Sequence, residues 1–189
     1  MRTNVFITAL AAASVSTALE TNAFRLVVGV VDHDLNPSLN GAMLGWETTG
    51  DCLAELVVKA DDYTPATFYQ SEGTVSAYDA EGPSSAGIIV TPGGTATVPS
   101  SKPVELKCGD GTPGVTIRQT PYAVTYELDF EDGVWMACPS PDNAERIAIT
   151  YRNQGQRTIE GCAEVKLFVM CDPNSGKLEG SETVGCNKL

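Results

Sequence analysis

Short runs of apolar or alternating residues recur along this chain, and Gly, Pro, Asn and Asp separate them. The runs are rich in β-branched and aromatic residues, and apolar residues almost never repeat at the helical spacing. Runs of this length at this spacing are typical of the strands of a β-sandwich or barrel. We expect strands at residues 24–31, 53–58, 67–70, 74–78, 87–90, 104–108, 115–118, 123–130, 134–138, 147–152 and 163–170. The predicted fold class is all-β, a single-domain antiparallel β-sandwich or barrel.

The N-terminal stretch MRTNVFITALAAASVSTALE resembles a secretory signal peptide. Arg2 supplies a positive start, residues 5–13 are almost entirely apolar, and Ser16-Thr17-Ala18 is a small-residue cleavage pattern. A membrane anchor is the alternative, but the apolar run is too short to span ~30 Å of hydrocarbon, and no later stretch is long enough. We expect residues 1–18 to be removed, with cleavage after Ala13 as the alternative.

Residues 19–189 are then expected to form one secreted β-domain. The segment 82–103 is rich in Pro, Gly, Ser and Thr, so a glycosylated linker between two domains is the alternative. We interpret the segment as loops around a strand, because each half of the chain alone would have a thin core.

The chain is strongly acidic. It has 12 Lys and Arg against 24 Asp and Glu, which gives a formal net charge of −12 at pH 7. Removal of Arg2, the only charged residue of the first 18, would change −12 to −13. This balance argues against nucleic acid or an anionic membrane as partner, since both attract basic surfaces.

Six cysteines follow the leader: Cys52, Cys108, Cys138, Cys162, Cys171 and Cys186. An even count behind a secretion signal predicts disulfides. A zinc site is the alternative, but the chain has no Cys-x-x-Cys pair and only one histidine. We therefore expect a disulfide-stabilised domain with no metal and no cofactor.

The cysteine pairing is predicted from a simple meander. If the strands at 134–138, 147–152 and 163–170 follow one another up, down and up, Cys138 and Cys171 lie at the same end and are expected to bond. Of the three pairings left for the other four cysteines, Cys52–Cys108 with Cys162–Cys186 is the most natural.

The only histidine lies in the stretch DHDLNPS, residues 32–38. A calcium loop beginning at Asp32 would need Gly at its sixth position and Glu at its twelfth, where this chain has Pro37 and Met43. Pro37 also excludes Asn36 as a sugar acceptor. We predict a surface turn in which Asp and Asn side chains bond nearby backbone groups, with a catalytic or metal role of His33 as the alternative.

Acidic residues near 127–132 are the candidates for a carboxylate-dependent hydrolase. Glu127 and Asp129 share one face of a predicted strand, as residues two apart do. We interpret them instead as the polar face of a half-exposed strand whose apolar side chains point inward, so no catalytic residue is assigned. The inward set is Tyr126, Leu128 and Phe130, and the remaining acidic candidates are Glu131 and Asp132.

Two tryptophans differ in their surroundings. Trp135, in VWMAC beside Cys138, is the expected core tryptophan, whereas Trp46 follows Gly45 in a turn-rich place and is the candidate ligand-binding residue at the surface. A carbohydrate-binding surface would use such an aromatic ring to stack on sugars.

Several phrases in order along the chain carry a resemblance: FRLVV from Phe24, ATFYQSEG from Ala66, GTPGV from Gly111, WMACP from Trp135, and GCAEVKL from Gly161, closed by Cys171. Together they resemble an uncharacterised family of small secreted proteins of filamentous fungi and, more loosely, fungal phialide cell-wall proteins. The resemblance implies export, an all-β domain and association with the fungal wall or its surroundings. It supplies no catalytic residue.

The sequence thus favours a secreted, non-enzymatic fungal β-domain protein that acts at the cell wall or a host surface. The alternatives are a carbohydrate-binding module and a small carboxylate-dependent hydrolase. The expected partner is a cell-wall polysaccharide or a host surface molecule, with no nucleic acid and no membrane span. The expected location is extracellular or in the cell wall.

The even cysteine count predicts that the mature protein has no free thiol. Thiol labelling of the denatured, unreduced protein checks this, and two or more labelled cysteines per chain would contradict it.

Overall fold

The computed structural model describes residues 19–58, 65–78, 85–120, 125–140, 145–172, 178 and 180–188. Strands and irregular segments make up this part of the chain, which contains no helix, so the predicted all-β class is confirmed. Within the same residues no helix is long and apolar enough to cross a bilayer. The predicted signal peptide, residues 1–18, lies outside them.

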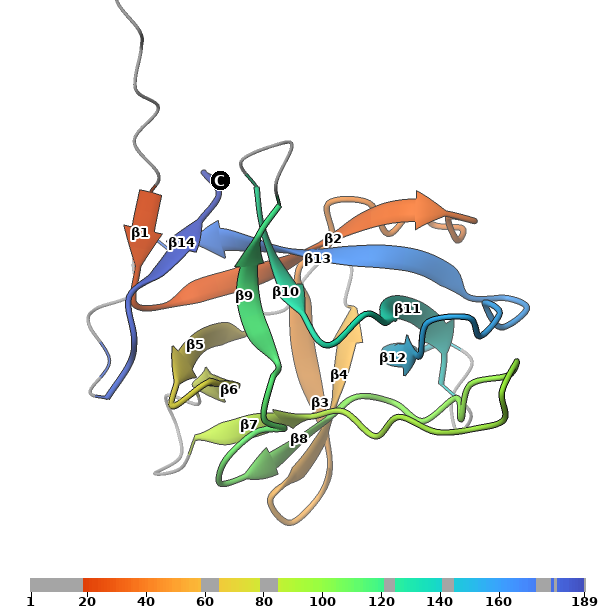
Figure 1. The fold of residues 1–189 in the computed structure, drawn as a ribbon, viewed down its shortest axis with the longest axis horizontal. Helices are drawn as coiled ribbons and strands as arrows, with labels where there is room; N and C mark the ends of the chain where they lie inside the picture. The colour runs from red at the N-terminus through yellow and green to blue at the C-terminus, as the bar shows by residue number, and fades with distance from the viewer. Residues whose placement is uncertain are drawn as a thin grey trace, which may run out of the picture.

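The strands are short and follow one another along the whole domain (Figure 1). In chain order they are β1 (Leu19–Thr21), β2 (Phe24–Asp32), β3 (Leu44–Gly50), β4 (Leu53–Val58), β5 (Thr67–Ser71), β6 (Thr74–Tyr78), β7 (Ala86–Ile89), β8 (Glu105–Cys108), β9 (Thr116–Gln119), β10 (Tyr126–Asp129), β11 (Val134–Pro139), β12 (Ile147–Arg152), β13 (Ala163–Cys171) and β14 (Val184–Cys186).

Nine strands close into a barrel. The order β11-β12-β4-β8-β7-β6-β5-β2-β13 returns to its start because β13 also pairs with β11. Each pairing is antiparallel, and the longest ladder joins β13 to β2 from Glu164↔Asp32 to Cys171↔Phe24. Closure leaves the members of the ring without an open sheet edge, which is how barrels avoid unpaired backbone groups.

The remaining strands branch from this ring. β3 pairs with β4 along its whole length, and β10 with β9 extends the sheet beyond β13. β4 is a fork, because its opposite edge pairs with β8 through Leu53–Glu55 and with β12 through Val57 and Val58. β1 and β14 form a separate two-stranded ribbon.

Every predicted strand overlaps an observed one, although residues 123–124 of one prediction lie outside the described residues. Three strands were not predicted: β1, β3 and β14. The prediction that Trp46 lies in a turn-rich segment is wrong, because Trp46 is in the middle of β3 and pairs with Leu56. The polar stretch between Gly45 and Gly50 becomes a strand only through its partner β4.

The barrel interior is filled by alternating side chains, as the pleat requires. Phe24, Leu26 and Val28 of β2 are fully or almost fully buried and pack in one core. Trp135 is a core residue as predicted, and its indole N–H donates to the Leu128 carbonyl at 2.9 Å. Burial, followed by the charge of Glu131, raises the pKa of Tyr151 to about 12.

The three disulfides are Cys52–Cys108, Cys138–Cys162 and Cys171–Cys186, and the described residues include no free cysteine. The predicted Cys52–Cys108 bond is confirmed. The predicted bonds Cys138–Cys171 and Cys162–Cys186 are wrong. β13 runs antiparallel to β11, with Ala137 opposite Ala163, so the start of β13 and not its end lies beside Cys138. The Cα atoms of Cys138 and Cys162 are 4.4 Å apart.

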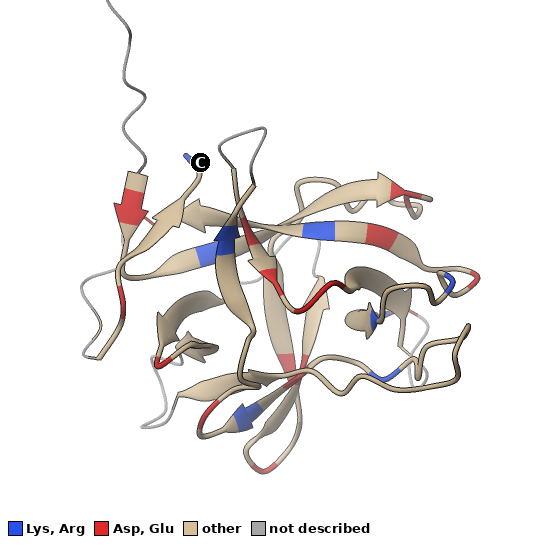
Figure 2. Ribbon diagram, viewed as in Figure 1, with Lys and Arg blue, Asp and Glu red and all other residues tan. Residues whose placement is uncertain are grey.

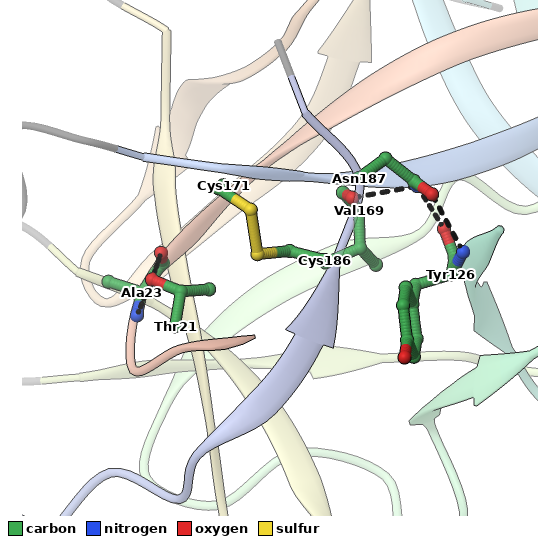
Figure 3. Close-up of a disulfide and its surroundings, with 7 residues drawn as sticks. All are labelled: Thr21, Ala23, Tyr126, Val169, Cys171, Cys186 and Asn187. Atoms are coloured by element: carbon green, nitrogen blue, oxygen red, sulfur yellow. Dashed lines mark hydrogen bonds between the residues drawn. A yellow bond between two sulfur atoms is a disulfide. The ribbon is translucent and has the colours of Figure 1, made fainter. Parts of the chain in front are cut away.

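The C-terminal segment is fastened to the barrel by Cys171–Cys186 and by the amide of Asn187 (Figure 3). This amide accepts a hydrogen bond from the Tyr126 N–H and donates to the carbonyls of Tyr126 and Val169, at 2.8–3.0 Å. A Cβ on Gly185 would meet the Tyr126 ring at 2.0 Å, so this close approach requires glycine. These contacts hold β10 and β14 against the C-terminal end of β13.

A partly buried ion pair supports β13 near its start. Arg152 bonds to the Glu164 carboxylate, which also accepts a hydrogen bond from the Thr158 hydroxyl. The Thr158 hydroxyl, followed by Arg152, lowers the pKa of Glu164 against the opposing effect of burial. A carboxylate with a lowered pKa in the fold stabilises it above the unfolded pKa, and this contribution is lost as pH falls through the folded pKa.

We predict that peptide mapping without reduction will recover linked peptides joining Cys138 to Cys162 and Cys171 to Cys186. A linked peptide joining Cys138 to Cys171 would show that β13 does not run antiparallel to β11.

We predict that Glu164→Gln lowers the free energy of unfolding by about 1–3 kcal/mol at pH 7, since a charge-assisted hydrogen-bond pair is lost. The difference should shrink as the pH is lowered from 5 to about 3, where the wild-type carboxylate also becomes protonated. Denaturant unfolding across this range measures it, with the exposed Glu160→Gln as the control. A deficit that is independent of pH would contradict the assigned role of the charge.

Candidate functional site

A cavity of about 250 Å³ opens at one end of the barrel, under the β3–β4 hairpin. Its walls come from β3, β4, β6, β7 and β8 and are mostly apolar. The lining residues are Trp46, Thr48, Gly50, Cys52, Leu53, Ala54, Ala77, Ala86, Leu106 and Cys108. Barrel mouths are frequent places for small-ligand sites.

Trp46 is the largest side chain in this wall. It is partly buried and packs against the core, so one part of the ring is anchored while another part borders the cavity. The neighbours Ala54, Ala77 and Ala86 carry only a methyl group each, which leaves the space beside the indole open. The arrangement offers a fixed aromatic surface, at low entropic cost, to one ring or one apolar group.

The outer rim of the cavity is made rigid by the Cys52–Cys108 disulfide. It joins the tip of the β3–β4 hairpin to the end of β8, with the two Cα atoms 5.2 Å apart. The Cys108 N–H also donates to the Cys52 carbonyl at 3.3 Å. In Figure 1 this hairpin projects past β8 at the bottom of the view, and the disulfide fastens its tip to the end of β8.

On the opposite face of the hairpin, three charged side chains meet. Glu47 and Glu55 lie directly opposite each other on β3 and β4, where like charges destabilise a sheet. Arg146 lies between them, with nitrogen–oxygen distances of 3.5 Å to Glu47 and 3.1 Å to Glu55, and also donates to the Ser140 hydroxyl at 2.8 Å. Arg146 therefore keeps β3 in place against β4 from outside the cavity.

Among the residues that the structure describes, the lining of this cavity includes no ionisable group, because both of its cysteines are in a disulfide. General acid–base or nucleophilic catalysis needs a titratable or nucleophilic side chain at the site. The chemistry that this lining supports is the binding of an apolar or aromatic group. No group of His, Cys, Asp or Glu side chains among the described residues is arranged to hold a metal ion.

A second, smaller hollow of about 180 Å³ lies beside the Cys138–Cys162 disulfide. Thr150 and Cys138 contact each other there, with 3.2 Å between Oγ1 and Sγ. Its described lining residues include Pro103, Pro139 and Ile159 but no aromatic residue. It therefore lacks the feature that makes the first cavity a candidate site.

His33 lies in an exposed turn, as predicted for this stretch. The Asp34 carboxylate accepts hydrogen bonds from the Ser38 hydroxyl and from the N–H groups of Leu35 and Leu39. These bonds, that from Ser38 first, lower the pKa of Asp34. The pair of His33 with Asp32, at 2.8 Å, is exposed on both sides and lines neither cavity.

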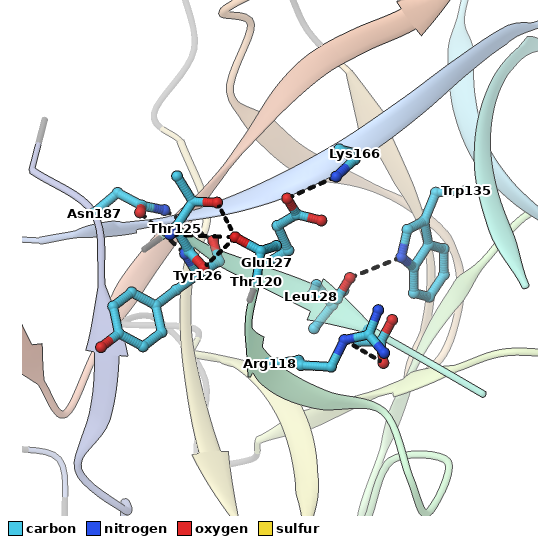
Figure 4. A network of polar contacts seen from close by, with 10 residues as sticks. Arg118, Thr120, Thr125, Tyr126, Glu127, Leu128, Trp135, Lys166 and Asn187 are labelled. Atoms are coloured by element: carbon cyan, nitrogen blue, oxygen red, sulfur yellow. Dashed lines mark hydrogen bonds and ion pairs between the residues drawn. The ribbon is translucent and has the colours of Figure 1, made fainter. Parts of the chain in front are cut away.

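Glu127 and Asp129 are each paired with a cation of their own, and Figure 4 shows the pair of Glu127 with Lys166. Lys166 lies 2.9 Å from Glu127, and Arg118 lies 3.2 Å from Asp129. Burial raises the pKa of Asp129, and Arg118 opposes this effect. Neither carboxylate lines either cavity, so the structure does not place these two acids at the candidate site.

Sequence reasoning selected Trp46 but missed its neighbours. Ala77, Ala86 and Leu106 come from three strands distant in the sequence, and only the closed barrel brings them to the indole. The one signal that pointed to this place was the predicted Cys52–Cys108 pairing, which ties the hairpin after Trp46 to the strand of Leu106.

The model of a family described as Domain of unknown function (DUF7907) matches residues 21–171, which is most of the chain and includes every wall of the cavity. No curated protein and no solved structure matches.

We predict that Arg146→Gln lowers the free energy of unfolding by about 1–3 kcal/mol, because Glu47 and Glu55 then face each other without a cation. Glu55→Gln in the same chain should restore part of the loss by removing the repulsion. A double-mutant cycle from denaturant unfolding measures the coupling. Additive losses would show that Arg146 does not act through the two glutamates.

Proposed function

Because the chain belongs to the DUF7907 family, whose description assigns no activity, we propose from its structure that it is a secreted, non-enzymatic binding domain. It acts at a fungal cell wall or at a host surface and holds one group of its partner in the barrel mouth against Trp46. The partner is a wall polysaccharide or a molecule of the host surface.

The extracellular location is supported by the sequence and by the disulfides together. All six cysteines are paired, and structural disulfides persist mainly in oxidising compartments outside the cytosol. The leader-like residues 1–18 and the fungal resemblance point the same way. The net charge of −12 keeps such a domain soluble and away from anionic surfaces.

The observation that carries the binding role is the cavity of about 250 Å³, which borders a tryptophan partly packed into the core and whose described lining residues include no ionisable group. A preformed apolar hollow with one aromatic wall favours recognition over turnover. None of the carboxylates considered for a hydrolase lines the cavity, and two of them, Glu127 and Asp129, are paired with Lys166 and Arg118. A binding domain is therefore the function that this geometry supports best.

The test is a pull-down of wall polysaccharides and of host surface extract with the mature protein, followed by affinity measurement for the molecule recovered. Trp46→Ala should weaken binding by about 1–3 kcal/mol, the range for aromatic platforms that stack on planar rings. Tyr78→Ala is the matched control, because Tyr78 is an exposed aromatic residue that does not line the cavity. Unchanged affinity of Trp46→Ala, or hydrolysis of the recovered molecule, would contradict the proposal.

A further inference from the structure

β3 is an edge strand whose outer side has free main-chain groups. Leu56 donates its N–H to the Val104 carbonyl, on the side of β4 away from β3. Its partner Trp46 must then direct its own N–H and C=O away from β4. Two opposite residues of an antiparallel pair either bond to each other or both direct their main-chain groups away from the partner strand. The Leu44 carbonyl, two residues earlier, points outward likewise and accepts from Ala66 at 3.0 Å.

Beyond Leu44, none of the residues that the structure describes pairs with this outer edge. The main-chain groups of Trp46 and Thr48 have no hydrogen-bond partner among the residues that the structure describes. Exposed strand edges are templates for pairing with another chain, and proteins usually blunt them. β3 has no proline, lysine or arginine that would do so.

The cavity lies on the face of β3 that carries the Trp46 side chain, so side chains of a strand added at the free edge would reach it. Trp46, Thr48 and Gly50 alternate along β3 and all line the cavity, whereas Glu47 points to the other face and contacts Arg146. A strand added beside β3 in the antiparallel sense would direct the side chains opposite Trp46 and Thr48 to the cavity face. Its intervening side chains would lie on the face of Glu47.

The charges along the hairpin select the partner. Residues 44–58 include Glu47, Asp51 and Glu55 but no lysine or arginine, and the hairpin in Figure 2 accordingly carries red segments only. The whole chain has a net charge of −12, which opposes the pairing of β3 with a second copy of itself. A cationic partner is favoured by this net charge. Its positive side chains would lie on the face of Glu47, whose half-exposed carboxylate is shared with Arg146 at 3.5 Å.

We propose that β3 and the adjoining cavity form a docking groove for an extended, cationic peptide segment of another protein. The segment adds to β3 as an antiparallel strand, bonds to the main-chain groups of Trp46 and Thr48, and places an apolar side chain against the Trp46 ring. The inference rests on the proposed binding function and names the class of partner. It is strand addition, in which backbone bonds give affinity and a pocket gives specificity.

The probe is an acetylated, amidated nine-residue peptide in which lysine alternates with valine. We expect it to bind the wild-type protein in isothermal titration calorimetry, and the same peptide with glutamate in place of lysine to show no measurable binding. Methylation of the valine amide nitrogens should weaken binding at least tenfold, because these amides face β3. Methylation of the lysine amide nitrogens is the matched control and should change the affinity less than twofold.

Protein variants test the same contacts from the other side. Thr48→Pro removes one free edge N–H and should weaken peptide binding at least tenfold, whereas Thr48→Ser keeps this N–H and should bind as wild type does. The melting temperature shows whether each variant is folded, and the methylated peptides test the proposal on wild-type protein if Thr48→Pro does not fold.

Absence of binding by the lysine–valine peptide, or binding that survives methylation of the valine amide nitrogens, overturns the inference. Recovery of a polysaccharide whose binding depends on Trp46 but not on the Thr48 N–H would also overturn it and would leave the proposed binding function intact. If Trp46→Ala leaves the affinity for every recovered molecule unchanged, the proposed binding function itself is contradicted.

Discussion

β13 holds the barrel together because both of its edges are paired with other strands. One edge of β13 carries the long ladder to β2, and the other edge pairs with β11 near its start and with β10 at Phe168. Because this strand joins the first and the last parts of the ring, its direction determines which strands become neighbours. The disulfides Cys138–Cys162 and Cys171–Cys186 fasten its two ends, and the amide of Asn187 bonds to the carbonyl of Val169 within it.

Closure of the ring through β13 leaves β3 outside the ring. The edge of β4 that faces away from β8 and β12 pairs with β3, which lies outside the ring and, in the part of the chain that the structure describes, has no further strand beside it. Arg146 and the Cys52–Cys108 disulfide hold β3 rigidly in this position, so the hairpin is a fixed element rather than a loose flap. The cavity, the Trp46 ring and the unpaired backbone groups are therefore presented together.

The sequence predicted what depends on local chemistry. Alternation within β2, β4 and β13 reflects the pleat, and the turn around Asp34 follows from side-chain bonds to nearby N–H groups, so both could be anticipated. β3 could not, because its glycines and polar residues form a strand only against β4. Predicting the bond of Cys138 to Cys162 also required the direction of β13 relative to β11. The ten-residue connection 153–162 determines this direction, and no local pattern encodes it. Trp46 was selected as a surface residue, but its cavity depends on strands distant in the sequence.

Hydrogen exchange of the β3 amides in the folded protein tests the central claim most directly. If β3 is an edge strand with its outer side open, the amides of Trp46 and Thr48 will exchange at rates close to those of exposed residues. The amides of Gly45 and Glu47, which face Val57 and Glu55 of β4, will be protected by orders of magnitude. Protection of Trp46 and Thr48 equal to that of Glu47 would show that another segment covers the edge, and the groove would not exist.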